Sequence, residues 1–496
     1  MLPRTPYVSF VSNGVPTRCE YDSLGTREIP ATAYYGIHTV RAVKNFPISG
    51  IPLSAYPDLI AALAVVKQAA AEANHRLGLL DTQRCQAIVD ACKEIRKGQL
   101  HDNFLVDVIQ GGAGTSTNMN ANEVIANRAL EMLGRHPGDY DHLDPLEHVN
   151  LGQSTNDAYP TAIKIALQVQ ISRLYGTLLD LEKAFSKKSE EFKGLLKMGR
   201  TQLQDAVPMT LGQEFGTYAV MVSEDAERLI EASALVAEIN LGGTAIGTGL
   251  NSHPLYAPMV CGVLAELTRL PLTSADDLVE ATQDVGAFVQ LSGVLKRTAL
   301  KLSKICNDLR LLSSGPRSGF NEINLPPVQA GSSIMPGKVN PVIPEVVNQV
   351  AFEVVGNDMT ISMAAEGGQL QLNAFEPVIA YSLFNSLTHL DAACRTLIDN
   401  CIVGITANPE QLSRSVTNSI GVITALSPYL GYTTSARIAK RALQTGRSIL
   451  DLIVEEGLLS AAQVSELLRP ERLITPTDRA DIVPRFDVAP VKETER

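Results

Sequence analysis

The sequence predicts a mainly α-helical protein built around a central bundle of long helices. Three observations lead to this prediction. Apolar residues recur at helical spacing over several long runs, and glycine and proline are concentrated between those runs. Strand-like alternation is scarce, and no G-x-G-x-x-G follows a strand. Helices this long exceed the needs of one compact domain, so we expect them to pack lengthwise on one another or on copies from other subunits.

The helices are expected in the following order along the chain. Pro160 and Pro208 suit the first turn of a helix, and each is predicted to open one. Gly242 and Gly243 are expected to stop the helix that Pro208 opens. The longest run is expected to span about 50 Å if it is unbroken, and it covers residues 278–313. The predicted helices are residues 59–80, 160–193, 209–240, 278–313, 344–368 and 374–403.

Shifts in composition near residues 134–150 and 407–409 predict three domains. These are an N-terminal domain at 1–152, a central long-helix domain at 153–407 and a small C-terminal domain at 408–496. The N-terminal residues lack the apolar segment of a secretory signal, and no apolar run approaches the roughly 20 residues of a membrane span. We therefore expect a cytoplasmic protein without membrane partners.

Charge and cysteine usage exclude several classes of function. The net charge is −11 and no basic stripe is present, which argues against a nucleic-acid partner. Seven cysteines without a C-x-x-C motif fit reduced thiols, and no histidine pattern indicates a metal site. Three histidines and several acidic residues share residues 136–148. Pro137, Gly138 and Pro145 there favour a solvated loop over the alternative of a metal site.

Four polar segments interrupt the helical runs, each at or near an expected helix N-terminus. Free N–H groups and the helix dipole favour an anion there. Any one segment is also explained as a simple helix cap, because Ser, Thr, Asn and Asp are preferred N-caps. Together they predict one pocket rich in neutral donors, suited to a small polycarboxylate. The segments are residues 111–120, 153–157, 199–205 and 331–341.

The fourth segment carries the most chemical information. From Gly331 to Pro341 it reads Gly-Ser-Ser-Ile-Met-Pro-Gly-Lys-Val-Asn-Pro. Its glycines and prolines predict an irregular loop whose N–H groups are free to face an anion. Lys338 adds a full charge, while Ser332 and Ser333 add hydroxyls that can take or give a proton. On this segment alone, a plain surface connector is the alternative.

Residues 331–341 resemble the signature of the aspartase/fumarase superfamily, whose members release fumarate by β-elimination. The resemblance extends over about residues 21–470, with similar motifs at 25–30, 33–36, 112–116, 153–160 and 242–251. It implies a three-domain fold of that type, and a homotetramer in which three subunits contribute to each active site. The match is closest to the aspartase branch, which implies a carbon–nitrogen lyase that reversibly eliminates ammonia from L-aspartate to give fumarate. No cofactor is implied for the chemistry, and activation by a divalent cation is left open.

The resemblance also implies roles for individual residues. Ser332 matches the catalytic base, acting as an alkoxide that the loop N–H groups and Lys338 stabilise. The proton removed from Cβ leaves an aci-carboxylate intermediate. Asn156, Thr201 and Gln202 are expected on the α-amino side of the substrate. The matching substrate-binding residues are Thr115, Ser154, Thr155, Asn156, Thr201, Gln202, Ser333 and Asn340.

Two alternatives remain: a fumarate hydratase and a catalytically silent helical scaffold. Fumarases of the superfamily carry a histidine after Gly-Arg-Thr, where this chain has Gln202. An amide cannot shuttle a proton to a departing hydroxide, whereas an α-ammonium leaves as neutral ammonia without an acid. Intact Ser332, Lys338 and Asn340 argue against the scaffold. Leu146 replaces an Asn or Asp that is usual in relatives, which puts a secondary carboxylate site on this loop in doubt.

Overall fold

The computed structural model describes residues 16–331 and 333–473. Within these residues the chain is mainly helical, which confirms the predicted fold class. Strands in the described part form four two-stranded sheets. No helix in that part combines the length and the apolar character needed to cross a membrane.

The described residues form two compact units, each assembled from three stretches of the chain. The first unit holds residues 16–176, 225–299 and 350–391. The second holds residues 177–224, 392–473 and, apart from residue 332, 300–349. The three sequential domains expected from composition stay a prediction.

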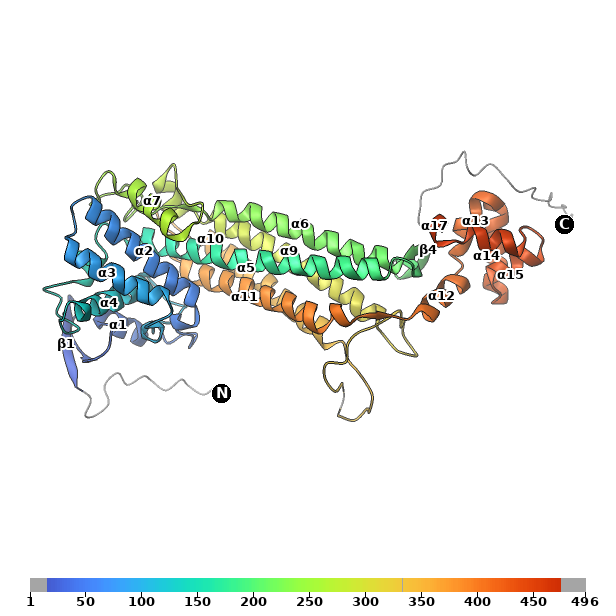
Figure 1. Cartoon of the computed structure of the whole chain (residues 1–496), viewed down its shortest axis with the longest axis horizontal. Coiled ribbons are helices and arrows are strands. Elements are labelled where there is room, and N and C mark those ends of the chain that lie inside the picture. Colours follow the sequence, from blue (N-terminus) through green and yellow to red (C-terminus); the bar gives the residue numbers. More distant parts are fainter. Residues whose placement is uncertain (1–15, 332, 474–496) are drawn as a thin grey trace. The chain divides into compact units, whose positions relative to one another are not determined.

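The first unit begins with a β-hairpin and a group of packed helices (Figure 1). Helix α2 packs along α3 and α7, and α3 packs along α4. Because α2 is covered on several sides, its Ala-rich sequence is buried over most of its length. A parallel pair, β5 with β6, lies next to α7. The elements are β1 (Thr17–Asp22), β2 (Gly25–Pro30), α1 (Ile37–Asn45), η1 (Leu53–Ala55), α2 (Pro57–Arg76), α3 (Thr82–Arg96), η2 (His101–Asn103), α4 (Thr115–Met132), the π-helical turn η3 (Pro145–Val149), β5 (Glu238–Ile239), α7 (Tyr256–Thr268), β6 (Thr273–Ser274) and α8 (Leu278–Gln283).

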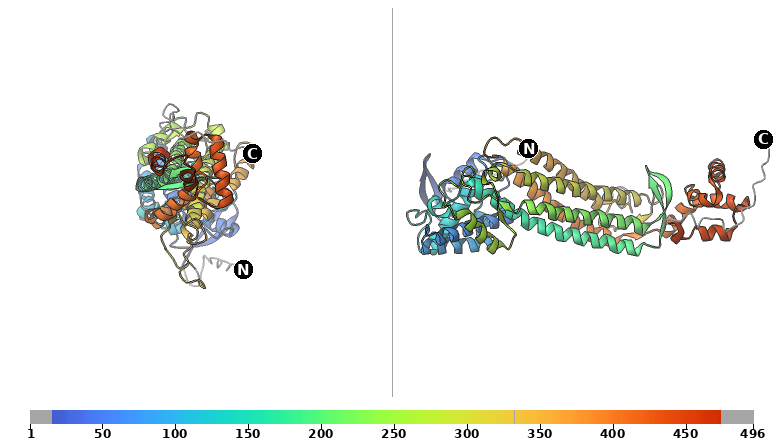
Figure 2. Two further views of the ribbon diagram at one scale, coloured as in Figure 1. Left: turned by 90° about the vertical axis from the view of Figure 1, so that its right-hand side faces the viewer. Right: turned by 90° about the horizontal axis from the view of Figure 1, so that it is seen from above.

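Both units contain parts of the same long helices, and within each unit these parts run alongside one another (Figures 1 and 2). In the first unit, the Ser292 hydroxyl of α9 donates to Asp358 of α10 over 2.8 Å. In the second, the Tyr218 hydroxyl of α6 donates to Asp308 of α9 over 3.2 Å. As predicted, lengthwise packing buries apolar residues of these helices, such as Leu174, Phe215 and Leu302. The helices are α5 (Thr155–Glu191), α6 (Leu211–Leu235), α9 (Gly286–Leu312), α10 (Val342–Glu366) and α11 (Glu376–Asn400).

The prediction that Pro160 opens a helix is wrong, because α5 begins five residues earlier and Pro160 lies inside it. A proline within a helix lacks the N–H that would bond the carbonyl four residues back, here that of Asn156. The side-chain amide of Asn240 donates to that carbonyl over 3.0 Å instead. This tertiary hydrogen bond lets the helix start before the proline.

The prediction that Pro208 opens a helix is also wrong. Residues around it form a hairpin of β3 (Leu196–Thr201) and β4 (Gln204–Thr210), and α6 starts only at Leu211. Gln202 and Leu203 both have positive φ at the hairpin turn. Pro208 pairs opposite Met198, next to a register shift, where a two-stranded edge tolerates a missing N–H.

The expected helix over residues 278–313 is broken between α8 and α9. Asp284 adopts an extended backbone after α8 and ends that helix. Its carboxylate accepts a hydrogen bond from the N–H of Gly286 over 2.8 Å, which starts α9. The apolar periodicity continues across the break, so it could not reveal the interruption.

The C-terminal helices of the second unit surround their own apolar core. Val422, Leu426, Ile438 and Leu452 are fully buried in it, together with Met198 from β3. A short antiparallel pair, β7 with β8, precedes these helices. The elements are β7 (Ile323–Asn324), η4 (Ile402–Gly404), β8 (Thr406–Ala407), α12 (Pro409–Asn418), α13 (Val422–Leu430), α14 (Tyr432–Thr445), α15 (Ile449–Glu455), α16 (Ala461–Leu467) and α17 (Pro470–Leu473).

Candidate active site

The first predicted substrate segment forms the turn before α4. Gly112, Ala113 and Gly114 all have positive φ, which a glycine adopts without strain. A Cβ at Gly114 would lie 2.5 Å from Cγ of Tyr159 in α5, so only glycine fits there. The turn thereby brings the N-terminus of α4 against α5. Thr115, the first residue of α4, is exposed, and its hydroxyl donates to the Gly112 carbonyl over 2.7 Å.

The second predicted segment starts α5, and Ser154, Thr155 and Asn156 are all partly exposed there. The Asn156 side chain donates to the Ala245 carbonyl over 2.7 Å. Asp157, fully buried, accepts the Ser154 N–H over 2.9 Å. The segment therefore faces solvent on one side and is fixed by hydrogen bonds on the other.

Asp157 also holds residues 242–244 against the start of α5. Its second carboxylate oxygen accepts the N–H groups of Gly242 over 3.0 Å and of Thr244 over 2.9 Å. Burial raises the pKa of Asp157 to about 6, while these backbone hydrogen bonds act in the opposite direction. The Asp157 carboxylate therefore links the motif at 153–160 to the motif at 242–251.

A buried lysine underlies both segments, and sequence reasoning missed it. Lys67 of α2 is fully buried, and its ammonium donates to side-chain oxygens of Asn118 (2.6 Å), Asn150 (2.9 Å) and Gln153 (2.8 Å). Asn118 in turn donates to the Thr155 hydroxyl oxygen over 3.2 Å. Burial lowers the pKa of Lys67 to about 7. In the sequence, Lys67 is marked only by lying, with Gln68, among the otherwise apolar residues 59–71.

A buried carboxylate from the same helix as Thr115 fixes the start of α1. Glu123 of α4 accepts the backbone N–H groups of Gly36 and His38, both over 2.8 Å. It also accepts the hydroxyl of Thr39 over 2.6 Å. A Cβ at Gly36 would lie 2.8 Å from the Glu123 carboxylate, so the motif at 33–36 needs glycine at this position. Burial raises the pKa of Glu123 to about 7.

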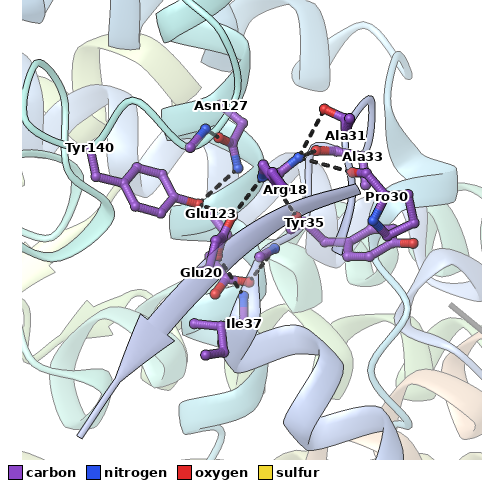
Figure 3. Close-up of polar contacts among 12 residues, drawn as sticks. Arg18, Glu20, Pro30, Ala31, Ala33, Tyr35, Ile37, Glu123, Asn127 and Tyr140 are labelled. Atoms are coloured by element: carbon purple, nitrogen blue, oxygen red, sulfur yellow. Dashed lines mark hydrogen bonds and ion pairs between the residues drawn. The ribbon is translucent and has the colours of Figure 1, made fainter. Parts of the chain in front are cut away.

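The N-terminal hairpin is tied to the same region by Arg18 and Glu20 (Figure 3). The Arg18 guanidinium donates to the Glu20 carboxylate over 2.8 Å and to the Ala33 carbonyl over 2.7 Å. Glu20 also accepts the Tyr140 hydroxyl over 3.0 Å, and the side chain of Asn127 in α4 donates to Tyr140 over 3.1 Å. The hairpin and the motif at 33–36 are thus held against α4.

Two further predicted residues lie in the second unit, at the β3–β4 hairpin. Thr201 and Gln202 are both exposed at its turn. Arg200, the residue before them, forms an ion pair of 2.6 Å with buried Glu322, which also pairs with Lys197 over 2.8 Å. Glu322 directly precedes β7, so these ion pairs join the hairpin to the root of the following loop. The third polar segment is therefore a hairpin turn, and the expectation that it heads a helix is wrong.

The glycine- and serine-rich loop follows β7 in the same unit. Ser332 lies outside the described residues, and Ser333 and Lys338 are exposed. The side-chain amide of Asn340 donates to the Gly331 carbonyl over 2.6 Å, which brings the two ends of the loop together. A Cβ at Gly331 would lie 2.7 Å from the carbonyl carbon of Lys338, so this closure requires glycine. Residues 327–331 and 335–339 line an open hollow of about 520 Å³.

The predicted site residues of one chain therefore fall into two sets. The first unit gathers Thr115 and residues 154–156 at the adjoining N-termini of α4 and α5. The second unit holds residues 201–202 on the hairpin and 333–340 on the loop. Their assembly into one site stays a prediction. Among the described residues, no group of three His, Cys, Asp or Glu side chains is placed to hold a metal ion.

Sequence comparison adds two family matches and several close relatives. The family described as Lyase matches residues 25–356, and the family described as Fumarase C C-terminus matches residues 422–475. The aspartate ammonia-lyase of Pseudomonas aeruginosa is 60% identical over 461 residues, covering 93% of this chain and 97% of that protein. The aspartate ammonia-lyase of Escherichia coli K12 is 51% identical over 471 residues, covering 95% and 98%.

Solved structures show the same fold. The cobalt-bound "fumarate lyase:delta crystallin" of Brucella melitensis has a TM-score of 0.91 and 53% identity, and covers 93% of this chain and 100% of that one. The class II fumarase of Schistosoma mansoni has a TM-score of 0.88 and 34% identity, with the same coverage. The fold and the match to the Lyase family together place this chain in the class of fumarase-type lyases.

The sequence identities of 51–60% to aspartate ammonia-lyases, over more than nine-tenths of the chain, identify the branch of that class to which the chain belongs. The chain belongs to the aspartate ammonia-lyase family, whose members are carbon–nitrogen lyases. The resemblance inferred from the loop at 331–341 is thereby confirmed.

Proposed function

We propose that this enzyme catalyses the reversible elimination of ammonia from L-aspartate to give fumarate. The observation that carries the proposal is the 60% identity to an aspartate ammonia-lyase along nearly the whole chain. The intact loop sequence at 331–341 supports it, because that segment supplies a hydroxyl, a lysine and free N–H groups together. The substrates are thus L-aspartate in one direction, and fumarate and ammonia in the other.

In the proposed mechanism, Ser332 is the base. Its alkoxide takes the proton from Cβ of L-aspartate, and the electron pair moves into the neighbouring carboxylate to give an aci-carboxylate dianion. Collapse of that dianion forms the C=C bond and expels the α-ammonium as neutral ammonia. A serine alkoxide needs stabilisation, which the loop N–H groups and Lys338 supply. The exposure of Lys338 in the structure is compatible with a substrate-facing role.

Neutral donors are proposed to bind the two carboxylates and the amino group. Ser333 and Asn340 complete the loop side, while Asn156, Thr201 and Gln202 face the amino group. The exposed or partly exposed positions of these five residues support such contacts. The substrate set is completed by Thr115, Ser154 and Thr155. The proposed route needs no cofactor for proton transfer.

We propose further that the enzyme is a homotetramer with active sites shared between subunits. An apolar stripe on α10 supports this assembly. Phe352, Val355, Met359 and Met363 are spaced three or four residues apart, and are 67%, 37%, 63% and 68% exposed. An apolar stripe of this kind indicates a protein interface. Copies packed on it would supply the partner segments that each site needs.

The test is fumarate consumption with and without ammonium. Loss of fumarate absorbance only when ammonium is present is the expected result. Equal loss without ammonium would instead identify a hydratase, and no loss under either condition would identify a silent scaffold. Ser332→Ala is expected to lower kcat by roughly 10²–10⁴, the usual contribution of a positioned base. Near wild-type turnover in that variant would remove Ser332 from the mechanism.

A further inference from the structure

The buried ammonium of Lys67 fixes the orientation of three side-chain amides. Its nitrogen lies within 2.9 Å of oxygens from Asn118, Asn150 and Gln153. Three amide oxygens around one nitrogen call for the three N–H donors of the protonated amine, which has no acceptor, so each partner turns its oxygen toward Lys67. The N–H₂ group of each amide must then point away from the ammonium.

The remaining contacts of these amides agree with that orientation. Gln153 Nε2 donates to the Val149 carbonyl over 3.0 Å, and Asn150 Nδ2 donates to the Gln153 carbonyl over 3.2 Å. Asn118 Nδ2 donates to Thr155 Oγ1 over 3.2 Å and to Asn150 Oδ1 over 3.1 Å. The direction of hydrogen bonding therefore runs from Lys67 through Asn118 to Thr155.

This direction determines what the Thr155 hydroxyl can do. Its oxygen already accepts from Asn118, so its proton is available for donation. A helical threonine often donates to the carbonyl four residues back, here that of Leu151. The Leu151 carbonyl already accepts from Asn74 over 2.8 Å and from Gln153 over 3.3 Å. Among the described residues, the Thr155 hydroxyl donates to no acceptor, and its side chain is partly exposed.

We propose that Lys67 is a positioning residue which, through Asn118, sets the Thr155 hydroxyl as a hydrogen-bond donor to a substrate carboxylate. The inference rests on the proposed function, because it gives the dicarboxylate of that reaction as the acceptor. A hydroxyl forced to donate inward would present only lone pairs to the carboxylate and would repel it. The buried lysine thus determines, through one amide, whether the site attracts or rejects a dicarboxylate.

The substitution Asn118→Asp separates this role from a structural one. It preserves the shape of the side chain and leaves Lys67 with an anionic partner. A carboxylate has no N–H, so Thr155 can satisfy it only by donating its own proton inward. The donor to substrate is then lost, together with the hydrogen bond from Asn118 to Asn150 Oδ1, while the contact of residue 118 with Lys67 is kept. The expected loss is one hydrogen bond to a charged group, about 10–100-fold in affinity.

The readout is the inhibition constant of succinate, an unreactive four-carbon dicarboxylate, measured in four proteins. These are the wild type, N118D, T155V and the double variant. N118D and T155V are each expected to weaken succinate binding about 10–100-fold, and N118D is expected to add less than twofold in the T155V background. If N118D does not fold, K67M takes its place, because without the ammonium the Asn118 amide is free to flip.

Two outcomes would overturn the inference. One is an unchanged inhibition constant of succinate in N118D. The other is that N118D weakens succinate binding by the same factor in the wild type and in the T155V background. The latter indicates a general effect of charge or of structure. N120D serves as a matched control, because Asn120 is buried on the same helix and bonds Leu105 and Asn103 instead; it should leave the inhibition constant unchanged. Wild-type turnover of L-aspartate, assayed in the same preparations, tests the proposed function separately.

Discussion

Replacing Gly331 by alanine should impair catalysis without removing any chemical group. Gly331 lies where the two ends of the loop meet, and Asn340 donates to its carbonyl over 2.6 Å. An added Cβ would lie 2.7 Å from the carbonyl carbon of Lys338 and 3.0 Å from the backbone nitrogen of Asn340. Both contacts are with backbone atoms, so no side chain can rotate away to make room.

The size of the effect follows from these distances. Non-bonded carbon atoms normally lie about 3.5–4.0 Å apart. The loop ends must therefore separate by about 1 Å, and Lys338 and the residues beside Gly331 must move with them. A displacement of about 1 Å at reacting groups lowers the rate roughly 100-fold. We expect kcat for L-aspartate to fall by that factor. The free energy of unfolding should change by no more than about 0.5–1 kcal/mol, because the loop is mostly exposed.

The assay is steady-state fumarate formation, with thermal melting as a check on the fold. Gly337→Ala is the matched control in the same loop. Gly337 has a φ of +80°, but nothing lies within 4 Å of an added Cβ. Its variant therefore suffers only backbone strain of roughly 1–2 kcal/mol, and its kcat should fall at most about tenfold. A kcat for G331A within threefold of wild type, or equal losses in the two variants, would refute the steric argument.

Three other predictions concern charge and assembly. Glu322→Gln removes the buried carboxylate that pairs with buried Lys197 and partly exposed Arg200, so the free energy of unfolding should fall by roughly 3 kcal/mol in urea titrations; an unchanged midpoint would contradict this. Burial raises the pKa of Glu376 to about 8, so its ionisation destabilises the folded protein progressively as pH rises from about 4.5 to 8. Glu376→Gln should therefore match the wild type near pH 4.5 and melt at a higher temperature than it at pH 9, and the reverse ordering would refute the assignment. Phe352→Asp places a charge on the exposed α10 stripe and should yield smaller species in sedimentation, with activity lost in parallel; an intact tetramer would exclude this stripe as an interface.

Local sequence patterns predicted the long helices well, because apolar periodicity and helix length are properties of short windows. The positions of the helix ends were less predictable. Pro160 lies inside α5 because Asn240, eighty residues away, supplies a donor to the carbonyl of Asn156. A partner so distant in sequence leaves no trace in the local pattern. Pro208 likewise pairs in a hairpin whose turn residues, Gln202 and Leu203, carry no glycine to mark it.

The candidate site was only partly predictable, because local patterns mark its exposed residues but not the distant residues that hold them. Exposed polar residues such as Thr115 and Lys338 lie in glycine-rich polar segments between the helical runs, and such segments can be recognised by residue type. The residues that hold them cannot be recognised in this way. Lys67 and Glu322 act through side chains brought together only by folding, and a lone buried charge in sequence looks like any surface charge. The direction of the hydrogen bond to Thr155 depends on Lys67 of α2 and Asn118 of α4, which are brought together only by folding.

The burial of Met198 among the C-terminal helices limits how this chain can be recombined. The strand that supplies Met198 also leads to the turn bearing Thr201 and Gln202, and Ser419 donates to Asp205 of the same hairpin over 2.7 Å. A chimera that imports the last helices from a relative would therefore meet a foreign surface on this hairpin. Such grafts should succeed only when residues 196–210 travel with them.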